Sequence, residues 1–287
     1  MIFETVFLGT NGSCAYNNGN RSKYGTNTSC VAVRINNDII LLDTGTGVMN
    51  LALPQAKLID GNTRKEINVM YSHYHNDHTC GLLFLKSLFD SESKVCFFGE
   101  RQLNPWQKIP RAVKAIIAGT ISPPSCPITV SDLKAELEYV TAKTAKGKFR
   151  VGEHFSIMVK THPLSHPGGA MGYRLEYAGR SLCYCTDVDL AEHQIDGEFD
   201  EELIKFVKNA NLLICDSFFP EGTKQPGWGH STPQECARLA EKANVKKLAL
   251  FHYNPELTDA QIDSLEQEAQ VIFPNTFASR DMMRFSL

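Results

Sequence analysis

The run Tyr71-Ser72-His73-Tyr74-His75-Asn76-Asp77-His78 places three imidazoles and one carboxylate within six consecutive positions. It follows the half-apolar segment Ile67–Met70, whose composition predicts a buried strand. The apolar segment Thr79–Phe89 behind it predicts a short buried helix. Proteins of the α/β class build their sites at the carboxyl ends of strands. The run therefore predicts a metal site at the end of a strand.

The spacing of these side chains predicts two neighbouring positions for a metal ion. His73 and His75 can converge on one cation from the strand end, whereas Asp77 and His78 lie past the bend and aim at a second point. Neutral imidazole suits zinc, iron and manganese, and a ligand set with room for a water is typical of catalytic sites. The alternative is a surface cluster of histidines without a function.

The pattern His73-x-His75-x-Asp77-His78 resembles the H-x-H-x-D-H signature of the metallo-β-lactamase superfamily. This resemblance implies an α/β fold, an αββα sandwich of two mixed β-sheets flanked by helices, which carries up to two metal ions. Asp43-Thr44-Gly45 is similar to the L-D-x-G element of the same family, in which the Asp supports the metal ligands.

The resemblance also implies the remaining metal ligands, which follow later predicted strands. It places the third histidine of the first metal at His166, with His162 as a rival by its nearness, the bridging carboxylate at Asp187 and the last histidine at His252. The implied set is His73, His75 and His166 for the first metal, Asp77, His78 and His252 for the second, and Asp187 between them.

The segment Gly229–Glu235 predicts the start of a helix. Thr232 and Glu235 form a T-x-x-E capping box, and Pro233 occupies the first helical position. His230 is thus held just before a helix amino terminus, a place suited to anions. We expect His230 to act as the general acid that protonates a leaving oxygen. The alternative is an ordinary turn histidine.

Length and composition predict one domain that spans residues 1–287, since 43% of the residues are hydrophobic. Residues 101–148 predict a short helix and loops that form a lid or a dimer surface, with Trp106 as a candidate homodimer contact. The nine cysteines are scattered without a C-x-x-C pair, which favours a reducing compartment. The first residues lack the basic flank and length of a signal or membrane segment, so we expect a soluble, cytoplasmic protein without membrane contact.

Two divalent cations, zinc in preference to manganese or iron, would activate a hydroxide for hydrolysis at neutral pH. Asp77 would orient that nucleophile or take its proton, and His230 would be the acid. The element Gly229–Thr232 is similar to the phosphodiesterase branch of the superfamily, which includes tRNA 3′-processing endonucleases and cyclic-phosphate phosphodiesterases. The resemblance therefore implies a metal-dependent phosphodiesterase.

The family's tRNA enzymes carry a substrate arm between the third histidine and the bridging Asp. Here only residues 167–186 separate His166 from Asp187, and one hairpin fills that length. The net charge of −3 also predicts no large nucleic-acid footprint. We therefore expect a small-molecule phosphodiester as substrate, such as a cyclic one. The alternatives are a thioester or lactone hydrolase of the same fold, and a metal-binding protein without enzymatic activity.

Overall fold

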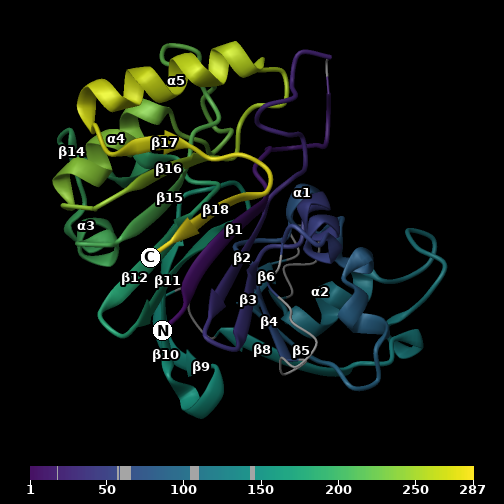
Figure 1. Ribbon diagram of the computed structural model, residues 1–287. Coiled ribbons are helices and arrows are strands. Elements are labelled where there is room, and N and C mark those ends of the chain that lie inside the picture. Colours follow the sequence, from purple (N-terminus) through teal and green to yellow (C-terminus); the bar gives the residue numbers. More distant parts are fainter. Residues whose placement is uncertain (18, 57, 59–65, 104–109, 143–145) are drawn as a thin grey trace.

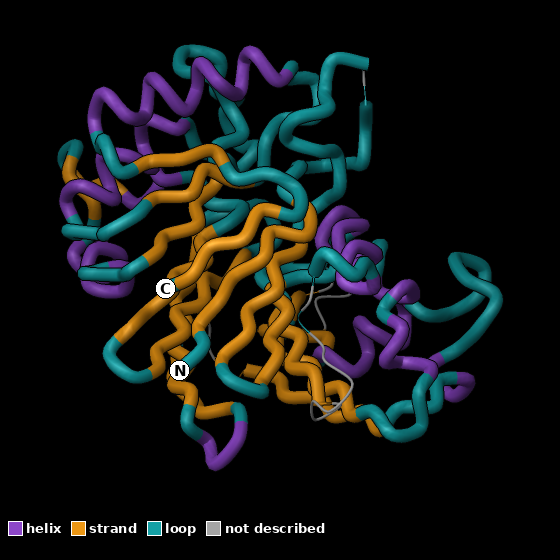
Figure 2. The backbone as a smooth tube through the Cα atoms, in the orientation of Figure 1, coloured by secondary structure: helices purple, strands orange, loops and turns teal. Residues whose placement is uncertain are grey.

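Two seven-stranded sheets lie face to face in the computed structural model, with helices on both outer sides (Figures 1 and 2). The structure describes residues 1–17, 19–56, 58, 66–103, 110–142 and 146–287. The predicted αββα sandwich of two mixed sheets is confirmed. Trp106 and the dimer contact expected of it lie outside the described residues.

The first sheet has the strand order β18-β1-β2-β3-β4-β5-β8. From β3 to β8 the neighbouring strands are parallel, and the others are antiparallel. Its strands are β1 Phe3–Gly9, β2 Cys30–Ile35, β3 Asp38–Leu42, β4 Glu66–Met70, β5 Lys94–Glu100, β8 Glu136–Ala142 and β18 Met283–Ser286.

The second sheet has the strand order β17-β16-β15-β12-β11-β10-β9. The strands from β12 to β17 are parallel, whereas β9, β10 and β11 form an antiparallel meander. Its strands are β9 Gly147–Val151, β10 Ile157–Leu164, β11 Ala170–Tyr177, β12 Arg180–Cys185, β15 Leu212–Asp216, β16 Leu248–Phe251 and β17 Thr276–Ala278.

Short elements complete the chain. Two pairs of short strands are β6 Gln102–Leu103 with β7 Pro110–Arg111, and β13 Gln194–Ile195 with β14 Glu198–Phe199. The α-helices are α1 Asn76–Thr79, α2 Val113–Thr120, α3 Glu201–Val207, α4 Pro233–Lys242 and α5 Asp259–Ile272. The 3₁₀ turns are η1 Thr46–Ala52, η2 Leu82–Phe84, η3 Lys86–Phe89, η4 Val130–Asp132, η5 Glu153–Phe155 and η6 Leu190–His193.

Three apolar clusters hold the layers together. Each forms where the apolar face of a sheet or helix is buried against a neighbouring element. The central cluster lies between the sheets and includes Phe7, Met70 and Tyr184. A second cluster joins the second sheet to α3, α4 and α5. A third joins the first sheet to η1 and α2. Figure 1 shows α3, α4 and α5 on one side of the sheets and α1 and α2 on the other.

Two predictions of local structure are wrong. The segment Thr79–Phe89 is not one helix, because α1 ends at Thr79 and the rest forms η2 and η3. Gly81 explains the break: its N–H donates to the Thr44 carbonyl, so it is not available for a helical bond. Within residues 101–148 the prediction of loops rather than sheet missed the strand β8 and the start of β9. The role of this segment as a lid or dimer surface stays a prediction.

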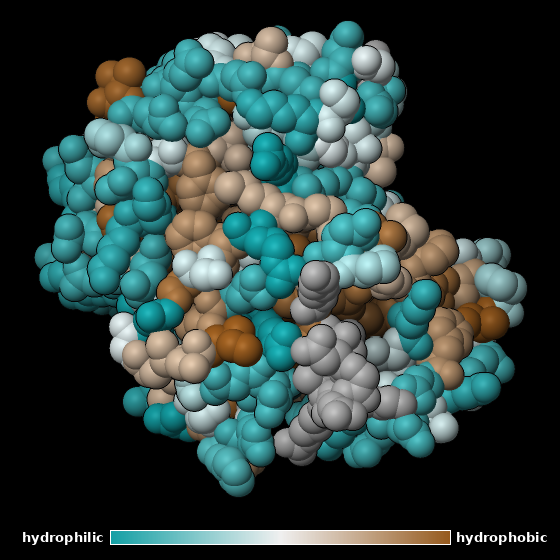
Figure 3. All heavy atoms as spheres, viewed as in Figure 1, coloured by the Kyte–Doolittle hydropathy of each residue, from teal (hydrophilic) through white to brown (hydrophobic). Residues whose placement is uncertain are grey.

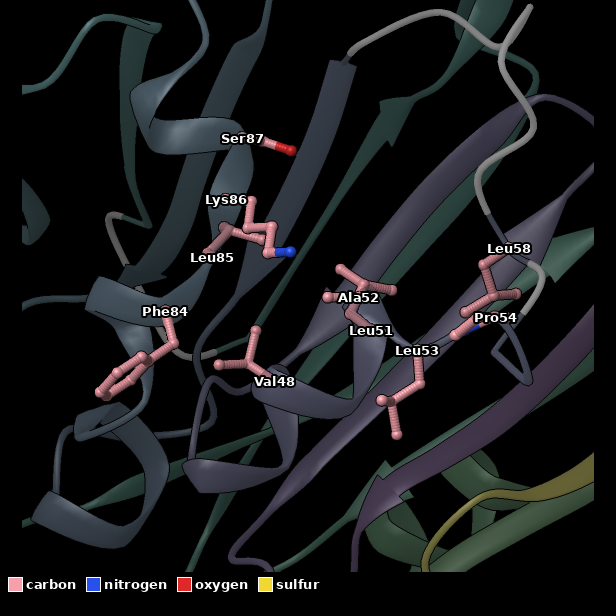
Figure 4. A pocket seen from close by; sticks show the side chains of 10 residues that line it. All are labelled: Val48, Leu51, Ala52, Leu53, Pro54, Leu58, Phe84, Leu85, Lys86 and Ser87. Atoms are coloured by element: carbon pink, nitrogen blue, oxygen red, sulfur yellow. The ribbon is translucent and has the colours of Figure 1, made fainter.

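Apolar side chains also reach the surface on the side of α1 and α2, where Figure 3 shows hydrophobic residues gathered. Exposed Leu53 and Phe84 belong to this group. A pocket of about 350 Å³ lies there between η1 and η2, and Figure 4 shows the side chains of Val48, Leu51 and Phe84 among its lining. None of the seven expected metal ligands lines it. Among the described residues, no helix is long and apolar enough to cross a membrane.

Candidate metal centre

The carboxyl ends of four strands meet at one edge of the sandwich. His73 follows β4, Asp187 follows β12 and His252 follows β16. Because β11 is antiparallel to both β10 and β12, β10 runs in the same direction as β12 and delivers His166 to the same edge. Parallel strands thus explain why residues far apart in the sequence converge here.

The first group of candidate ligands is His73, His75 and His166, whose ring nitrogens lie within 4.8 Å of one another. His166 Nε2 lies 3.2 Å from His75 Nδ1. The other nitrogen of His166 donates to the Gly229 carbonyl at 2.8 Å, which fixes the ring. His73 Nδ1 lies 3.1 Å from Ser72 Oγ, so its Nε2 is left to face the group.

The second group is Asp77, His78 and His252, again with ligand atoms within 4.8 Å of one another. Asp77 Oδ2 lies 3.2 Å from Nε2 of His78 and 3.2 Å from Nε2 of His252. The Ser13 N–H donates to the same oxygen at 2.8 Å. The loop after β1 therefore supports the aspartate from the opposite side.

Asp187 stands between the two groups. Its Oδ2 lies 3.1 Å from His78 Nε2 and 3.2 Å from His252 Nε2. Its Oδ1 lies 3.7 Å from His73 Nε2 and 3.6 Å from His166 Nε2. One oxygen thus faces each group, which is the geometry that a bridging carboxylate requires.

The residues fit divalent cations. His73 Nε2 is buried and has no hydrogen-bond partner among the described residues, a costly state that a bound ion would relieve. His78 Nε2 and His252 Nε2 face each other at 3.3 Å, with two carboxylate oxygens beside them. Burial and the neighbouring His78 lower the pKa of His73, which favours the neutral imidazole that binds metals. Burial would lower the pKa of His78, but Asp187, Asp77 and Asp43 raise it, so this position favours positive charge.

Asp43 holds the ligands from behind. His78 Nδ1 donates to Asp43 Oδ2 at 2.8 Å, and the Tyr184 hydroxyl donates to the same oxygen at 2.9 Å. The N–H and hydroxyl of Ser72 donate to the carboxylate at 2.8 and 2.7 Å. Such contacts fix the tautomer and direction of a metal-ligating histidine. The position agrees with the supporting role expected of Asp43.

Three residues at this edge have left-handed backbone. Asp43, Asp187 and His252 have φ values of 62°, 52° and 62°, and each comes within two residues of a strand end. Residues other than glycine rarely adopt this conformation, and it gathers at functional sites. The bend turns each side chain from the sheet toward the edge.

His230 lies beside both groups and is paired with Asp216. Its Nδ1 donates to Asp216 Oδ2 at 2.6 Å, and its ring centroid is 5.1 Å from that of His166 and 5.1 Å from that of His252. Burial would lower the pKa of His230, but the Asp216 carboxylate outweighs burial and raises the pKa to about 9. The capping box places this residue, because Thr232 accepts from the Glu235 N–H as α4 begins.

The structure brings all seven expected ligands and His230 to one place. His162, the rival of His166, is not in the cluster: its ring stacks on Phe206 with the centroids 5.1 Å apart. Sequence reasoning missed Asp216 and Ser13. Asp216 had a visible signal, since it is an acid at the end of a predicted buried strand, whereas Ser13 acts through its backbone and has none.

The chain is similar to known proteins over nearly its whole length. The chain is 25% identical to ribonuclease Z of Picrophilus torridus over 325 aligned positions, which cover 99% of this chain and 96% of that protein. Among solved structures, the short form of human tRNase Z has a TM-score of 0.64 at 19% identity, with 99% and 98% of the two chains covered. Zinc-bound PqqB of Methylobacterium extorquens has a TM-score of 0.65 at 17% identity, with 99% and 100% covered.

These relatives correct the expected substrate. The prediction of a hydrolase, and of metal-dependent phosphodiester cleavage, is confirmed by relatives named ribonuclease Z. The prediction of a small-molecule partner without a nucleic-acid footprint is wrong, because the same relatives are named for RNA. Residues 167–186 do form a single hairpin, β11–β12, as expected. The error lay in the inference drawn from it and from the net charge, since a sum over all residues does not report the local charge of any one face.

A family profile described as "Beta-lactamase superfamily domain" matches residues 39–253, more than half of the chain. The matched range includes the whole run His73–His78, His166, Asp187 and His252. This chain therefore belongs to the beta-lactamase superfamily.

Proposed function

We propose that this protein is a metal-dependent phosphodiesterase that cleaves a phosphodiester bond in RNA. The observation that carries this proposal is the bridging position of Asp187 between two groups of ligands, beside the His230–Asp216 pair. Similarity to proteins named ribonuclease Z over nearly the whole chain supports RNA as the substrate class.

Two divalent cations would be held by the two groups, the first by His73, His75 and His166 and the second by Asp77, His78 and His252, with Asp187 between them. When bound, such a pair polarises a phosphoryl oxygen and supplies a nucleophilic water at neutral pH. Imidazole and carboxylate ligands suit zinc, and manganese or iron are compatible with the same donors. Similarity to a zinc-bound structure supports zinc as the first choice.

His230 would move the proton on the leaving side. Its Nδ1 is committed to Asp216, so its Nε2 is the atom that donates a proton to the leaving oxygen. Asp216 is itself fixed, because the N–H groups of Val188 and Phe218 donate to its two oxygens at 3.2 and 3.0 Å. Asp77, held by the Ser13 N–H, would orient the attacking water.

An exposed tryptophan, Trp228, packs on the aromatic residues beside His230 and suits a nucleotide substrate. Phe218 stacks on the His230 ring at a centroid distance of 4.5 Å, and Phe219 and Trp228 pack against Phe218. Trp228 is 56% exposed, unusual for so large an apolar side chain. Phe218 and Phe219 are buried, so Trp228 is the ring that would stack on a base, a contact that contributes about 1–3 kcal/mol.

The test is cleavage by the full chain of a 3′-extended tRNA, bis(p-nitrophenyl) phosphate, a thioester and a lactone. Each substrate is assayed with zinc, with manganese and with a chelator. We expect metal-dependent cleavage of the RNA and the simple diester, and no turnover of the thioester or lactone. Cleavage of the thioester or lactone without either phosphodiester would overturn the proposal.

A further inference from the structure

The outer face of the meander β9–β10–β11, together with α3, gathers positive side chains. We call it the basic face, and Figure 1 shows its strands below α3. Two pockets, of about 380 and 350 Å³, hollow it. Its cations are Lys146, Lys148, Arg150, Lys160, Arg174 and Lys205.

The strand register forces like charges together on this face. Lys160 on β10 is directly opposite Lys148 on β9 and directly opposite Arg174 on β11. Like charges in directly opposed positions destabilise a sheet. Glu176 relieves this row in part, since it lies 2.8 Å from Lys160 Nζ and 2.7 Å from Arg174 Nε. One carboxylate thus serves two cations.

Few carboxylates form ion pairs with the cations of the basic face. In the described part of the chain, Lys146 pairs with Glu202, and Lys205 pairs with Glu201 and Glu202. With Glu176, three carboxylates therefore face six cations and leave an excess of three positive charges. The chain as a whole carries a net charge of −3, so this excess is local. A concentrated field of one sign attracts a partner of the opposite sign.

The basic face leads toward the candidate metal centre along β10. His162 lines one of its pockets, and the His162 ring centroid is 6.1 Å from that of His193. His193 Nε2 accepts from the Ser165 N–H, and Ser165 adjoins His166 in a separate pocket of about 180 Å³. Lys160 precedes His166 by six residues, roughly 20 Å of extended chain.

We propose that the basic face binds the phosphate backbone of the RNA substrate, away from the bond that is cleaved. This inference rests on the proposed function. Lys148, Arg150 and Lys160 would contact phosphates, which would supply the missing counter-charge. The Arg174 guanidinium is instead committed to Glu176, Ser181 and the carbonyls of Phe206 and Lys208. The face would therefore position the RNA and contribute little to the chemical step, because backbone contacts fix register without touching the reacting atoms.

The test compares two double variants of the metal-loaded full chain. Lys148→Glu with Arg150→Glu changes two exposed cations of the basic face, and Lys134→Glu with Lys246→Glu makes the same charge change at exposed lysines outside it. With 3′-extended tRNA we expect the first variant to raise KM at least about tenfold while kcat stays within about twofold. The second variant should leave both unchanged. Hydrolysis of bis(p-nitrophenyl) phosphate, too small to reach the face, should be the same in all three proteins.

Salt dependence gives a second readout. The slope of log affinity against log salt concentration should become shallower by at least about 0.7 for each cation lost in contact with a single strand. Equal RNA affinity and equal slopes for the two variants would overturn the inference. If the wild type bound RNA through the face but cleaved no phosphodiester, the proposed function would fail and the basic face would stand, so the two failures are distinguishable.

Discussion

Among single residues, His230 is the one whose substitution best distinguishes a role in catalysis from a role in metal binding. It lies beside both ligand groups, yet its Nδ1 is committed to Asp216 and its ring is held by Phe218. His230→Ala should lower kcat for phosphodiester cleavage by about 10²–10⁴-fold, because it removes the proton donor. The bound metal per chain, measured by elemental analysis, should not change.

His154→Ala is the matched control, since this histidine is exposed and lies outside every candidate metal group. It should retain both turnover and metal. Unchanged turnover in His230→Ala would show that the acid assignment is wrong, and lost metal would show that His230 acts as a ligand.

At the scale of one element, α4 connects stability to activity through its first turn. Thr232 caps the helix by accepting from the Glu235 N–H, two residues after His230. Thr232→Ala should lower the free energy of unfolding by about 1 kcal/mol. It should also lower kcat severalfold, because the residue that fixes the entry to α4 also fixes His230. Urea unfolding and steady-state kinetics measure the two effects.

The amino-terminal cap of helix α5 offers a matched control for the Thr232 substitution. Thr258 caps it in a T-x-x-Q box, away from the ligands. Thr258→Ala should cost a similar free energy of unfolding and leave kcat unchanged. Equal loss of kcat in both variants would mean that α4 acts through stability alone.

The contact between β10 and α3 gives the stability a pH dependence. His162 is buried against Phe206, and burial together with His193 lowers the pKa of His162 to about 4. The unfolded chain therefore binds a proton at about pH 6.5 that the folded chain accepts only near pH 4. The contribution of neutral His162 to the free energy of unfolding is therefore fully present above pH 6.5 and is lost as the pH falls toward 4.

His162→Phe keeps a ring on Phe206 and removes the titration. Between pH 7 and 4.5 the free energy of unfolding of the wild type should fall further than that of the variant, by on the order of 1–3 kcal/mol. Urea unfolding with a chelator present measures it, so that loss of metal does not contribute. Parallel pH profiles of the two proteins would contradict this explanation.

Elements with a local signal were predictable, and those set by distant contacts were not. The capping box at Thr232 predicted the start of α4, because capping involves residues only three apart. The break at Gly81 was not visible, since it depends on the Thr44 carbonyl of another segment. β8 was missed because its alternation of exposed and half-buried residues is that of an edge strand, far weaker than the apolar runs of the central strands.

The same limit applies to the site. The run His73–His78 indicated four of the seven candidate ligands, and the resemblance to the metallo-β-lactamase superfamily implied His166, Asp187 and His252. The pairing of His230 with Asp216 spans 14 residues and two elements, and only the placement of β15 beside α4 reveals it. Strand register brings the cations of the basic face side by side. The net charge of the chain is a sum over all residues, so it could not predict this local excess.

At the scale of the molecule, the candidate metal centre joins the two sheets. Four ligands, from His73 to His78, follow a strand of the first sheet, and the other three follow strands of the second. Cations bound between them would stabilise the folded chain and not the unfolded one, in which the ligands are far apart. Zinc at 100 times its Kd should add about 2.7 kcal/mol to the free energy of unfolding for each site that it fills.

For a chain of this size that gain corresponds to a rise in Tm of several degrees, measured by calorimetry with zinc and with a chelator. Asp187→Asn should reduce the rise, because the bridging carboxylate contributes an oxygen to each group, whereas Asp132→Asn at an exposed turn should retain it in full. If zinc leaves the Tm of the wild type unchanged, the ligands do not hold a cation across the two sheets. If Asp187→Asn keeps the full rise, metal binding does not depend on a bridging carboxylate, and each group of three ligands would have to hold its cation without Asp187.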